Sequence, residues 1–331
     1  MNIFDKIYRQ ARRNPKRIVL PEGDEGRVLE AVAFAVKEKL ARIVLLGEKD
    51  LIVKKAKKVR LDTGKIEIID PRQDEGLDAC ARAYWNLRKH RGITVQYARD
   101  LLLKNFVYYG AMMLREGRVD GFVAGAAHKT SDVVRAILHC IEKDSRYSTA
   151  SGSFLVEVKD RRYGERGLFL FADCAVVPLP TTQQLVAIGM ASCDVWAKIT
   201  GYKGRLAMLS FSTRGSSSAP SVDRVRDAAE ILKKTRPDLI IDGEMQVDSA
   251  VEPFVARIKV PDSPLAGRAN ILIFPSLDAG NIAYKLMQRL AGARVVGPII
   301  QGVSRPCCDL SRGASPKEII DAIAVTAVMA K

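Results

Sequence analysis

The chain has 331 residues, of which 47% are hydrophobic and 27% are charged, a composition typical of a folded globular protein rather than a disordered one. Its formal net charge of +15 favours a polyanionic partner, either nucleic acid or a small anionic substrate. No apolar run of about 18 residues or more occurs and no apolar signal segment opens the chain, so we expect a cytoplasmic protein without membrane spans.

Strands and helices are predicted to alternate along the first part of the chain. Three apolar runs, each typical of a strand, precede three segments of helical periodicity: 16–21 before about 25–39, 42–47 before about 49–59, and 66–70 before about 74–90. Two more helices between about 94 and 117 lead to a strand and glycine turn at 120–126, followed by a helix from about 130. This order predicts an α/β fold.

The middle of the chain departs from that alternation. Two apolar strands, 154–158 and 168–177, are separated by a charged, hairpin-like stretch, and a domain boundary near 145–150 fits this change. Alternation then resumes, with helices at about 181–198, 221–235 and 278–291, strands at 205–212, 270–277 and 295–302, and a terminal helix from Pro316.

Several common sites are disfavoured by their motifs. The six cysteines and three histidines show no metal-ligand spacing, so we expect no metal and free, mostly buried thiols. The absence of GxGxxG and GxxxxGK[ST] weakens a dinucleotide or nucleoside triphosphate interpretation. The polar loop SFSTRGSSS at 210–218 follows a strand, where α/β proteins bind ligands, but a flexible surface loop would look the same.

Two arginines stand close to predicted helix starts. Arg312 precedes a capping box formed by Ser315 and Glu318, and Arg135 lies near the first turn of a helix whose predicted N-cap is Thr130 or Ser131. The positive end of a helix dipole disfavours a cation by about 0.3–1 kcal/mol. Each arginine is therefore either solvated or binds an anion together with the helix.

Ordered segments across nearly the whole chain resemble the phosphate acetyltransferases, also called phosphotransacetylases. The segments are VLPEGDEGRVLEA (19–31), LRKHRGIT (87–94), VDGFVAGAAHKTSDVVR (119–135), ADCAVVPLPTTQQL (172–185), MLSFSTRGS (208–216), RPDLIIDGEMQVDSA (236–250), SPLAGRANILIFPSLDAGNIAYKLMQR (263–289), GPIIQG (297–302) and DLSRG (309–313). The resemblance implies two αβα domains with a cleft between them, as in isocitrate-type dehydrogenases, and a homodimer. We place the first domain at 1–147 plus 295–331 and the second at 148–294.

The resemblance also implies a reaction. Acetyl phosphate and coenzyme A would give acetyl-coenzyme A and phosphate, reversibly and in a ternary complex. Coenzyme A would be a substrate, with no further cofactor and no nucleic acid, because small anionic substrates already account for the positive charge.

Site residues follow from the same resemblance. Ser311 would donate to the transition state and Arg312 would bind the phosphate, while Arg88 and Arg135 would complete the basic site. Thr130 and Lys285 would be further contacts to acetyl phosphate.

Departures from the family pattern leave alternatives open. Glu318 stands where the best-known members carry an aspartate, and it could be the general base or only the helix cap. Lys129 and the pair Cys307-Cys308 also differ, so butyryl phosphate or another short-chain acyl phosphate is an alternative substrate. A non-catalytic sensor of coenzyme A or acyl phosphate and a nucleic-acid-binding protein are alternatives of other classes.

Overall fold

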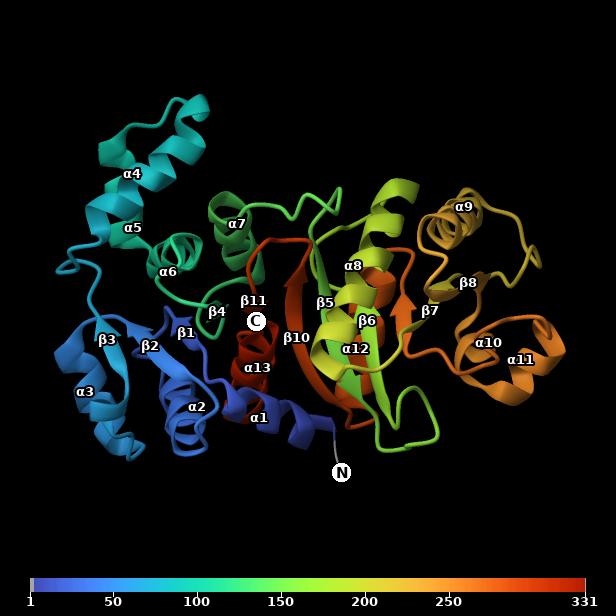
Figure 1. Cartoon of the computed structure of the whole chain (residues 1–331), viewed down its shortest axis with the longest axis horizontal. Coiled ribbons are helices and arrows are strands. Elements are labelled where there is room, and N and C mark those ends of the chain that lie inside the picture. Colours follow the sequence, from blue (N-terminus) through green and yellow to red (C-terminus); the bar gives the residue numbers. More distant parts are fainter. Residues whose placement is uncertain (1–2, 331) are drawn as a thin grey trace. The chain divides into compact units, whose positions relative to one another are not determined.

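The structure is a computed structural model that describes residues 3–330. The chain divides into two compact units, one comprising the chain up to Lys143 together with Val303 onward, the other spanning Asp144–Gly302. Each unit combines helices with a β-sheet, so the predicted α/β class is confirmed (Figure 1). Within residues 3–330, no helix has the length and apolar character needed to cross a bilayer.

The first unit contains a parallel sheet in the order β3-β2-β1-β4-β11. Its strands are short: β1 Arg17–Leu20, β2 Arg42–Leu46, β3 Glu67–Ile69, β4 Gly121–Ala124 and β11 Cys307–Asp309. The aliphatic residues of β1, β2 and β4 are buried, as expected for a parallel sheet covered on both faces. The three-residue β11 was not predicted, because it contains no apolar run.

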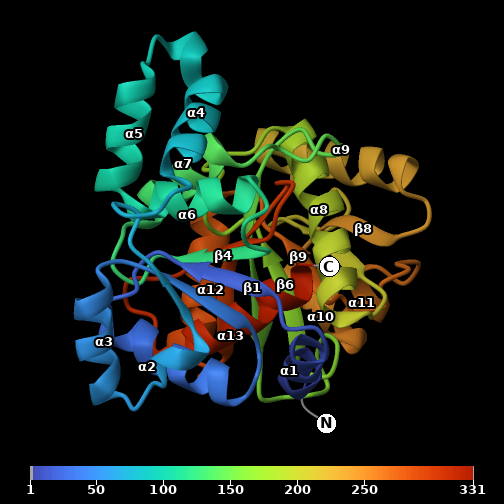
Figure 2. The ribbon, with the colours of Figure 1, turned by 60° about the vertical axis from the view of Figure 1, so that its left-hand side comes forward.

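Helices cover both faces of this sheet (Figures 1 and 2). The helices of this unit are α1 Ile3–Arg13, α2 Gly26–Lys37, α3 Lys49–Lys58, α4 Leu77–Arg88, α5 Val95–Lys104, α6 Phe106–Arg115, α7 Thr130–Cys140 and α13 Pro316–Met329, of which α4 and α5 pack on each other and on α6 and project away from the sheet. Helices α2 and α13 pack together on one face, whereas α6 and α7 pack together on the other. Close packing on α13 requires Gly121 in β4, because an added Cβ would lie 2.6 Å from the Thr326 side chain.

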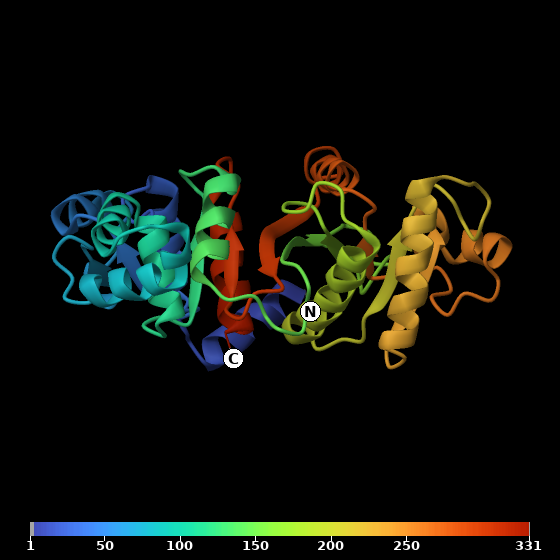
Figure 3. The same ribbon diagram turned by 90° about the horizontal axis from the view of Figure 1, so that it is seen from above.

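The second unit contains a mixed sheet in the order β10-β5-β6-β9-β7-β8. Its strands are β5 Ser151–Glu157, β6 Leu168–Ala172, β7 Arg205–Leu209, β8 Ile240–Met245, β9 Ile271–Ile273 and β10 Arg294–Gln301. Its helices are α8 Thr182–Thr200, α9 Pro220–Thr235, α10 Val247–Val251, α11 Pro253–Lys259 and α12 Leu277–Arg289. Helix α12 packs on the opposite side of the sheet from α8 and α9 (Figure 3), and its Tyr284 stacks on Phe154 with ring centroids 4.0 Å apart.

The predicted hairpin is present, because β5 and β6 are antiparallel. Residues 295–302 and 144–147, which the sequence analysis assigned to the first domain, lie in the second unit, where 295–301 are part of β10 and pair with β5. All six cysteines are free and buried, as predicted. The lysines of α3 lie mostly on its exposed face, with Ile52 and Ala56 buried.

The predicted N-cap of α7 is wrong. The cap position is Lys129, without a side-chain hydrogen bond, and Thr130 is already the first helical residue. The carbonyl of Lys129 accepts the first helical hydrogen bonds, from Asp132 at 2.9 Å and Val133 at 3.2 Å. The preceding loop is held from outside the helix, as described below, so the start of α7 does not depend on a capping side chain.

Asp173 follows β6 and organises a buried turn of the second unit. Its carboxylate accepts hydrogen bonds from the amides of Gly152, Ala175, Val176 and Val177 at 2.8 to 3.1 Å. Only 1% of Asp173 is exposed, and the amides of Gly152 and Val177 that it accepts from are in buried residues.

We expect Asp173→Ala to lower the free energy of unfolding by at least about 2 kcal/mol, because each unsatisfied buried amide costs about 1–3 kcal/mol. Asp173→Asn keeps one acceptor oxygen and should cost less. Urea denaturation followed by tryptophan fluorescence in a Trp85→Phe background, where the buried Trp196 of the same unit is the reporter, measures the change. The exposed Asp262→Ala is the matched control, and an equal loss in both variants would contradict the prediction.

Candidate active site

Two loops leave the carboxyl edge of the first unit's sheet side by side. Strands β4 and β11 are parallel neighbours, with Ala124 opposite Asp309 at their ends. Residues 125–129 form the β4–α7 loop and residues 310–315 form the β11–α13 loop. Five of the seven predicted site residues lie on these loops or on the helices that follow them: Thr130, Arg135, Ser311, Arg312 and Glu318.

Glu22, which follows β1, holds the β4–α7 loop. Its buried carboxylate accepts hydrogen bonds from four consecutive backbone amides, 125 to 128, at 2.8 to 3.1 Å, and lies 2.7 Å from Nδ1 of His128. Burial by itself would raise the pKa of Glu22, but the bonds from His128 and the loop amides outweigh it and hold that pKa below its ordinary value. The same contact raises the pKa of His128, and a fixed anion therefore sets the path of the loop.

Arg27, in the first turn of α2, ties the two loops together. Glu25 Oε1 orients it by accepting from Nε at 2.7 Å. Nη1 donates to the carbonyls of Arg312 at 2.7 Å and Ala314 at 3.0 Å, and Nη2 donates to the carbonyl of Ala126 at 2.8 Å. Because a guanidinium group is planar and rigid, these bonds set the spacing between the loops.

Ser311 and Arg312 are exposed on the β11–α13 loop. Ser311 Oγ accepts from the amide of Gly313 at 3.2 Å, which leaves the hydroxyl hydrogen to donate to another group. In the described part of the chain, no carboxylate forms an ion pair with Arg312, whereas Arg135 pairs with Asp132 at 3.1 Å. Arg312 thus stands before a helix N-terminus without an anion to offset the dipole, an arrangement suited to binding a phosphoryl group.

Asp309, the last residue of β11, is a buried carboxyl group at the base of these loops. Among residues 3–330, neither of its oxygens has a hydrogen-bond partner, although Thr130 lies close enough to favour the anion. Burial dominates and raises the pKa of Asp309 to about 7. The backbone of Gly125, with φ of +117°, lies directly against the Asp309 carboxyl group. Only glycine allows this close packing, because an added Cβ would lie 2.3 Å from Asp309 Oδ1.

The capping box predicted at Ser315 and Glu318 is confirmed. Ser315 Oγ accepts from the amide of Glu318 at 3.4 Å, and Glu318 Oε2 accepts from the amide of Ser315 at 2.7 Å. The Ser315 hydroxyl also donates to Oε2 at 2.8 Å. One carboxylate oxygen is therefore engaged in the start of α13, and a catalytic role for Glu318 stays a prediction.

Arg88 and Arg135 flank His139 on the α7 side of the first unit. Arg88 ends α4 and places Nη2 3.5 Å from His139 Nε2. His139 lies one turn after Arg135, and burial, Arg88 and Arg135 all lower its pKa. The structure therefore brings these two predicted site residues into one cationic cluster.

Lys285 lies in the second unit, exposed on α12, with Nζ 5.2 Å from the ring centroid of Tyr284. The polar loop 210–218 lies in the same unit, and buried carboxylates hold it. Glu244 Oε1 accepts from the Ser212 hydroxyl at 3.0 Å and the Gly215 amide at 2.8 Å. Asp242 pairs with Arg214 at 2.8 Å, so the one arginine of this loop is already neutralised.

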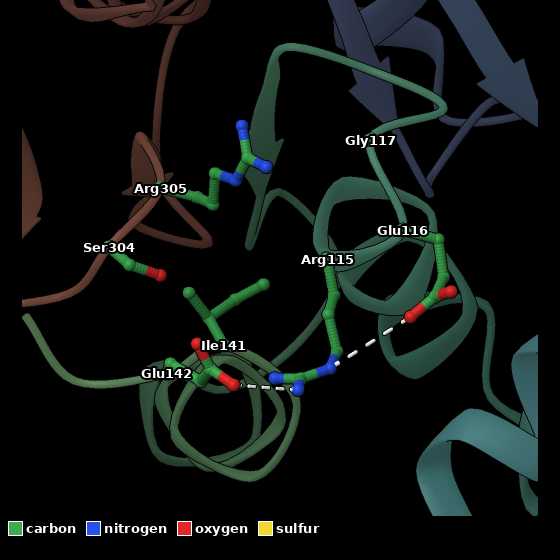
Figure 4. A pocket seen from close by; sticks show the side chains of 7 residues that line it. All are labelled: Arg115, Glu116, Gly117, Ile141, Glu142, Ser304 and Arg305. Carbon is green, nitrogen blue, oxygen red and sulfur yellow. Dashed lines mark hydrogen bonds and ion pairs between the residues drawn. The ribbon is translucent and has the colours of Figure 1, made fainter.

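A pocket of about 330 Å³ lies at the opposite, amino-terminal edge of the first unit's sheet. Arg115 is turned toward Glu142 and Glu116 there, at 2.8 Å and 3.9 Å (Figure 4). Arg305 and Ser304 come from the segment before β11. No predicted site residue lines this pocket, and Arg115 in it is paired with Glu142 and Glu116. We therefore do not assign the pocket to the reaction.

Sequence reasoning missed Glu22, Arg27 and Asp309. The first two lie in the segment 19–31 used for the resemblance, and Asp309 begins DLSRG, so their positions were noted without a role. Their contacts join residues about a hundred or more positions apart, which no local pattern reveals.

An α/β fold whose sheet edge carries an unpaired arginine, a free serine hydroxyl and a helix start defines a protein suited to anionic ligands. The sequence model described as phosphate acetyl/butaryl transferase matches residues 2–327. A phosphate acetyltransferase of Thermoanaerobacterium thermosaccharolyticum is 48% identical over 331 residues, covering 100% of both chains. The chain belongs to the phosphate acetyl/butaryl transferase family, as predicted.

Solved structures agree with this assignment. A phosphotransacetylase from Streptococcus pyogenes aligns with a TM-score of 0.91 at 38% identity, covering 99% of this chain and 98% of that one. A Salmonella typhimurium protein provisionally assigned as a 4-hydroxythreonine-4-phosphate dehydrogenase aligns with a TM-score of 0.55 at 11% identity, covering 95% and 99%. The second likeness shows the fold alone.

The contact between Glu22 and its loop predicts a distinctive pH dependence of stability. The lowered pKa of Glu22 gives a contribution present above about pH 4.3 and lost as pH falls through the folded value. The raised pKa of His128 gives a contribution present below about pH 6.5 and lost as pH rises through the folded value. Both contributions are therefore largest together between about pH 4.5 and 6.5.

We expect Glu22→Gln to lower the free energy of unfolding by about 1–3 kcal/mol, because an amide NH₂ would face backbone donors. The loss should be greatest in that pH window and shrink on either side. Denaturant titrations from about pH 4 to 8 measure it, with the exposed Glu30→Gln on α2 as control. A loss that does not vary with pH would contradict the ion-pair account.

Proposed function

We propose that the chain is a phosphate acetyltransferase, which transfers an acetyl group reversibly between acetyl phosphate and coenzyme A and thereby links them to acetyl-coenzyme A and phosphate. The observation that carries the proposal is the β11–α13 loop, with Ser311 and an unpaired Arg312 before a helix start, in a chain 48% identical over its full length to a phosphate acetyltransferase. The predicted class, an acyltransferase, is the class of these relatives. Coenzyme A is a substrate, and we propose no further cofactor.

The charge of the protein suits this reaction. Both substrates are anions, and a net charge of +15 raises their concentration near the protein. Arg88 adds positive charge on the first unit, beside Arg135, whose charge is shared with Asp132 at 3.1 Å. Nucleic acid is not needed to account for the excess of lysine and arginine.

In the proposed mechanism, the thiol of coenzyme A loses its proton to a base, and the sulfur electron pair attacks the acetyl carbonyl carbon. Negative charge builds on the carbonyl oxygen, and the Ser311 hydroxyl is free to donate to it. Such a donor contributes about 3–4 kcal/mol to the transition state. The bond between carbonyl carbon and phosphate oxygen then breaks, and phosphate leaves with the electron pair.

Arg312 is the proposed ligand of that phosphate. A guanidinium group can donate two parallel hydrogen bonds to a phosphoryl group, and the N-terminus of α13 adds a favourable dipole. Arg27 holds the carbonyl of Arg312 at 2.7 Å, so the backbone that carries this ligand is fixed before substrate binds. Thr130 and Lys285 remain proposed contacts to acetyl phosphate.

The base must act on a thiol with a pKa of about 8.5, which is mostly protonated at neutral pH. We propose Glu318 for this role, with the capping bonds to Ser315 orienting its carboxylate. A correctly placed base is worth about 10²–10⁴-fold in rate.

Thioester formation from coenzyme A with acetyl, propionyl and butyryl phosphate, measured in parallel, tests the function. Acetyl phosphate should give the highest kcat/KM. A preference for butyryl phosphate would replace the acetyl assignment by the longer acyl group. Binding of coenzyme A without turnover of any substrate would make the chain a sensor, and salt-dependent binding of duplex DNA that coenzyme A does not displace would favour a nucleic-acid partner.

We also propose a cytoplasmic homodimer. Helix α12 exposes an aliphatic stripe, with Ile282 57% exposed, Leu286 51% exposed and, just past its end, Leu290 81% exposed. Spacing of four residues places these side chains on one face, where a second copy could cover them. Sedimentation velocity distinguishes a dimer from a monomer.

Ser311→Ala should lower kcat by about 10–10³-fold with little change in KM, because the hydroxyl donates mainly in the transition state. Steady-state kinetics with both substrates varied gives the two constants separately. Ser304→Ala removes another exposed hydroxyl, located before β11, and serves as the control. A change confined to KM would make Ser311 a ground-state binding residue instead.

Glu318→Gln separates the two roles of that carboxylate. The amide oxygen can still accept the capping bond, so stability should change little, whereas loss of a base should reduce kcat by about 10²-fold or more and flatten the acidic limb of the pH profile. Glu318→Ala should in addition cost about 0.5–1 kcal/mol of stability. An active Glu318→Gln enzyme with the wild-type pH profile would assign the base to another residue.

A further inference from the structure

His139 lies between an anchored tyrosine and Arg88. Its Nδ1 is 3.1 Å from the hydroxyl of Tyr108 on α6, and its Nε2 is 3.5 Å from Nη2 of Arg88 at the end of α4. Tyr108 is buried and packs edge-on against Tyr84 of α4, with ring centroids 5.8 Å apart. Arg88, His139 and Tyr108 therefore form a row of contacts. Its Tyr108 end is fixed in the core of the first unit.

The chemistry of the two neighbours decides which nitrogen of His139 carries the proton. A guanidinium group only donates, so Nε2 must accept from Arg88. In the neutral ring the hydrogen then resides on Nδ1 and is donated to the Tyr108 hydroxyl, which burial keeps protonated by raising its pKa to about 12. Only the neutral imidazole with this tautomer satisfies both contacts.

Protonation of His139 would reverse the contact with Arg88. Nε2 would then carry a hydrogen that faces an N–H of Arg88, so the hydrogen bond would be lost. The ring would also carry a positive charge close to three arginines. The charged groups that act on the ring are Arg88 from α4, Arg135 from its own helix and Arg91 from the turn after α4, all of them cations. Together with burial they lower the pKa of His139, so the neutral form is the one present near pH 7.

We propose that neutral His139 is a positioning residue that holds the guanidinium of Arg88 in its substrate-binding orientation and releases it on protonation. The part that concerns substrate rests on the proposed function, in which Arg88 binds an anionic substrate. The part that concerns the contact itself does not, because it is a property of the free protein.

Imidazole titration tests the contact without any activity measurement. The chain has three histidines, His90, His128 and His139, whose ring resonances can be assigned by single His→Gln variants. Arg88→Gln should raise the pKa of His139, because it removes a cation and a donor. Arg82→Gln, an exposed arginine of the same helix, is the matched control and should leave it unchanged. An unaltered His139 titration in Arg88→Gln overturns the proposal.

Kinetics test the consequence for substrate. We first determine which KM, that of coenzyme A or of acetyl phosphate, Arg88→Lys raises. His139→Leu, which removes the acceptor, should raise the same KM by about three- to tenfold at neutral pH, as expected for loss of one hydrogen bond of ordinary net strength. His139→Gln should restore it, because the amide offers one acceptor to Arg88 and one donor to Tyr108.

The pH profile gives the final distinction. In the wild type that KM should rise as pH falls through the lowered pKa of His139, and in His139→Gln this rise should be reduced, since the amide does not titrate. His90→Gln, an exposed change nearby, should retain the wild-type profile. A KM that falls in acid in the wild type, or a His139→Gln profile identical to it, overturns the positioning role. Failure of acetyl transfer in every variant and the wild type would instead count against the proposed function.

Discussion

The site of the first unit depends on the buried carboxylate of Glu22. Four backbone amides after β4 converge on it, and without an acceptor those of the buried Gly125 and Ala126 would be left unpaired, a cost of about 1–3 kcal/mol each. The anion therefore dictates where the β4–α7 loop runs. Because β4 and β11 are parallel neighbours, that path also limits where the β11–α13 loop can lie, and Arg27 links the two through their carbonyls.

Buried carboxylates organise polar loops in the second unit by the same physical means. Asp173 binds three amides after β6 and that of Gly152 in β5, and Glu244 binds the loop 210–218 after β7. Asp242 adds a fully buried carboxylate paired with Lys233 at 2.7 Å and Arg214 at 2.8 Å. The protein has a net charge of +15, and these few buried carboxylates lie where backbone amides or cationic side chains would otherwise lack a partner.

Arginines near helix starts show how local neutralisation selects the groups left for substrate. Arg27 contacts Glu25, and Arg135 contacts Asp132. Within residues 3–330 Arg312 has no such carboxylate, although it stands at the start of α13. The unfavourable position of this cation is offset if a phosphoryl group binds between it and the helix, which is the arrangement the proposed reaction requires.

The sequence by itself determined the α/β class, most strands and helices, the capping box and the family. Apolar runs, helical periodicity and a Ser-Pro-Lys-Glu signature act over a few residues, so they can be read locally. It did not reveal β8, β11, α10 or α11, which are short segments without a clear apolar period, and it did not reveal that Lys129 caps α7, because the loop before that helix is held by Glu22.

Within the candidate site, Ser311, Arg312 and Glu318 were identified through motifs, whereas the roles of Glu22, Arg27, Asp309 and His139 were not. Arg27 contacts a carbonyl 285 positions away, and Glu22 contacts amides more than 100 positions away. Likewise, His139 meets Tyr108 and Arg88 only because α4, α6 and α7 pack together. Only the tertiary structure decides these roles, because the protonation and orientation of each group depend on burial and on partners that chain folding brings to it from other elements.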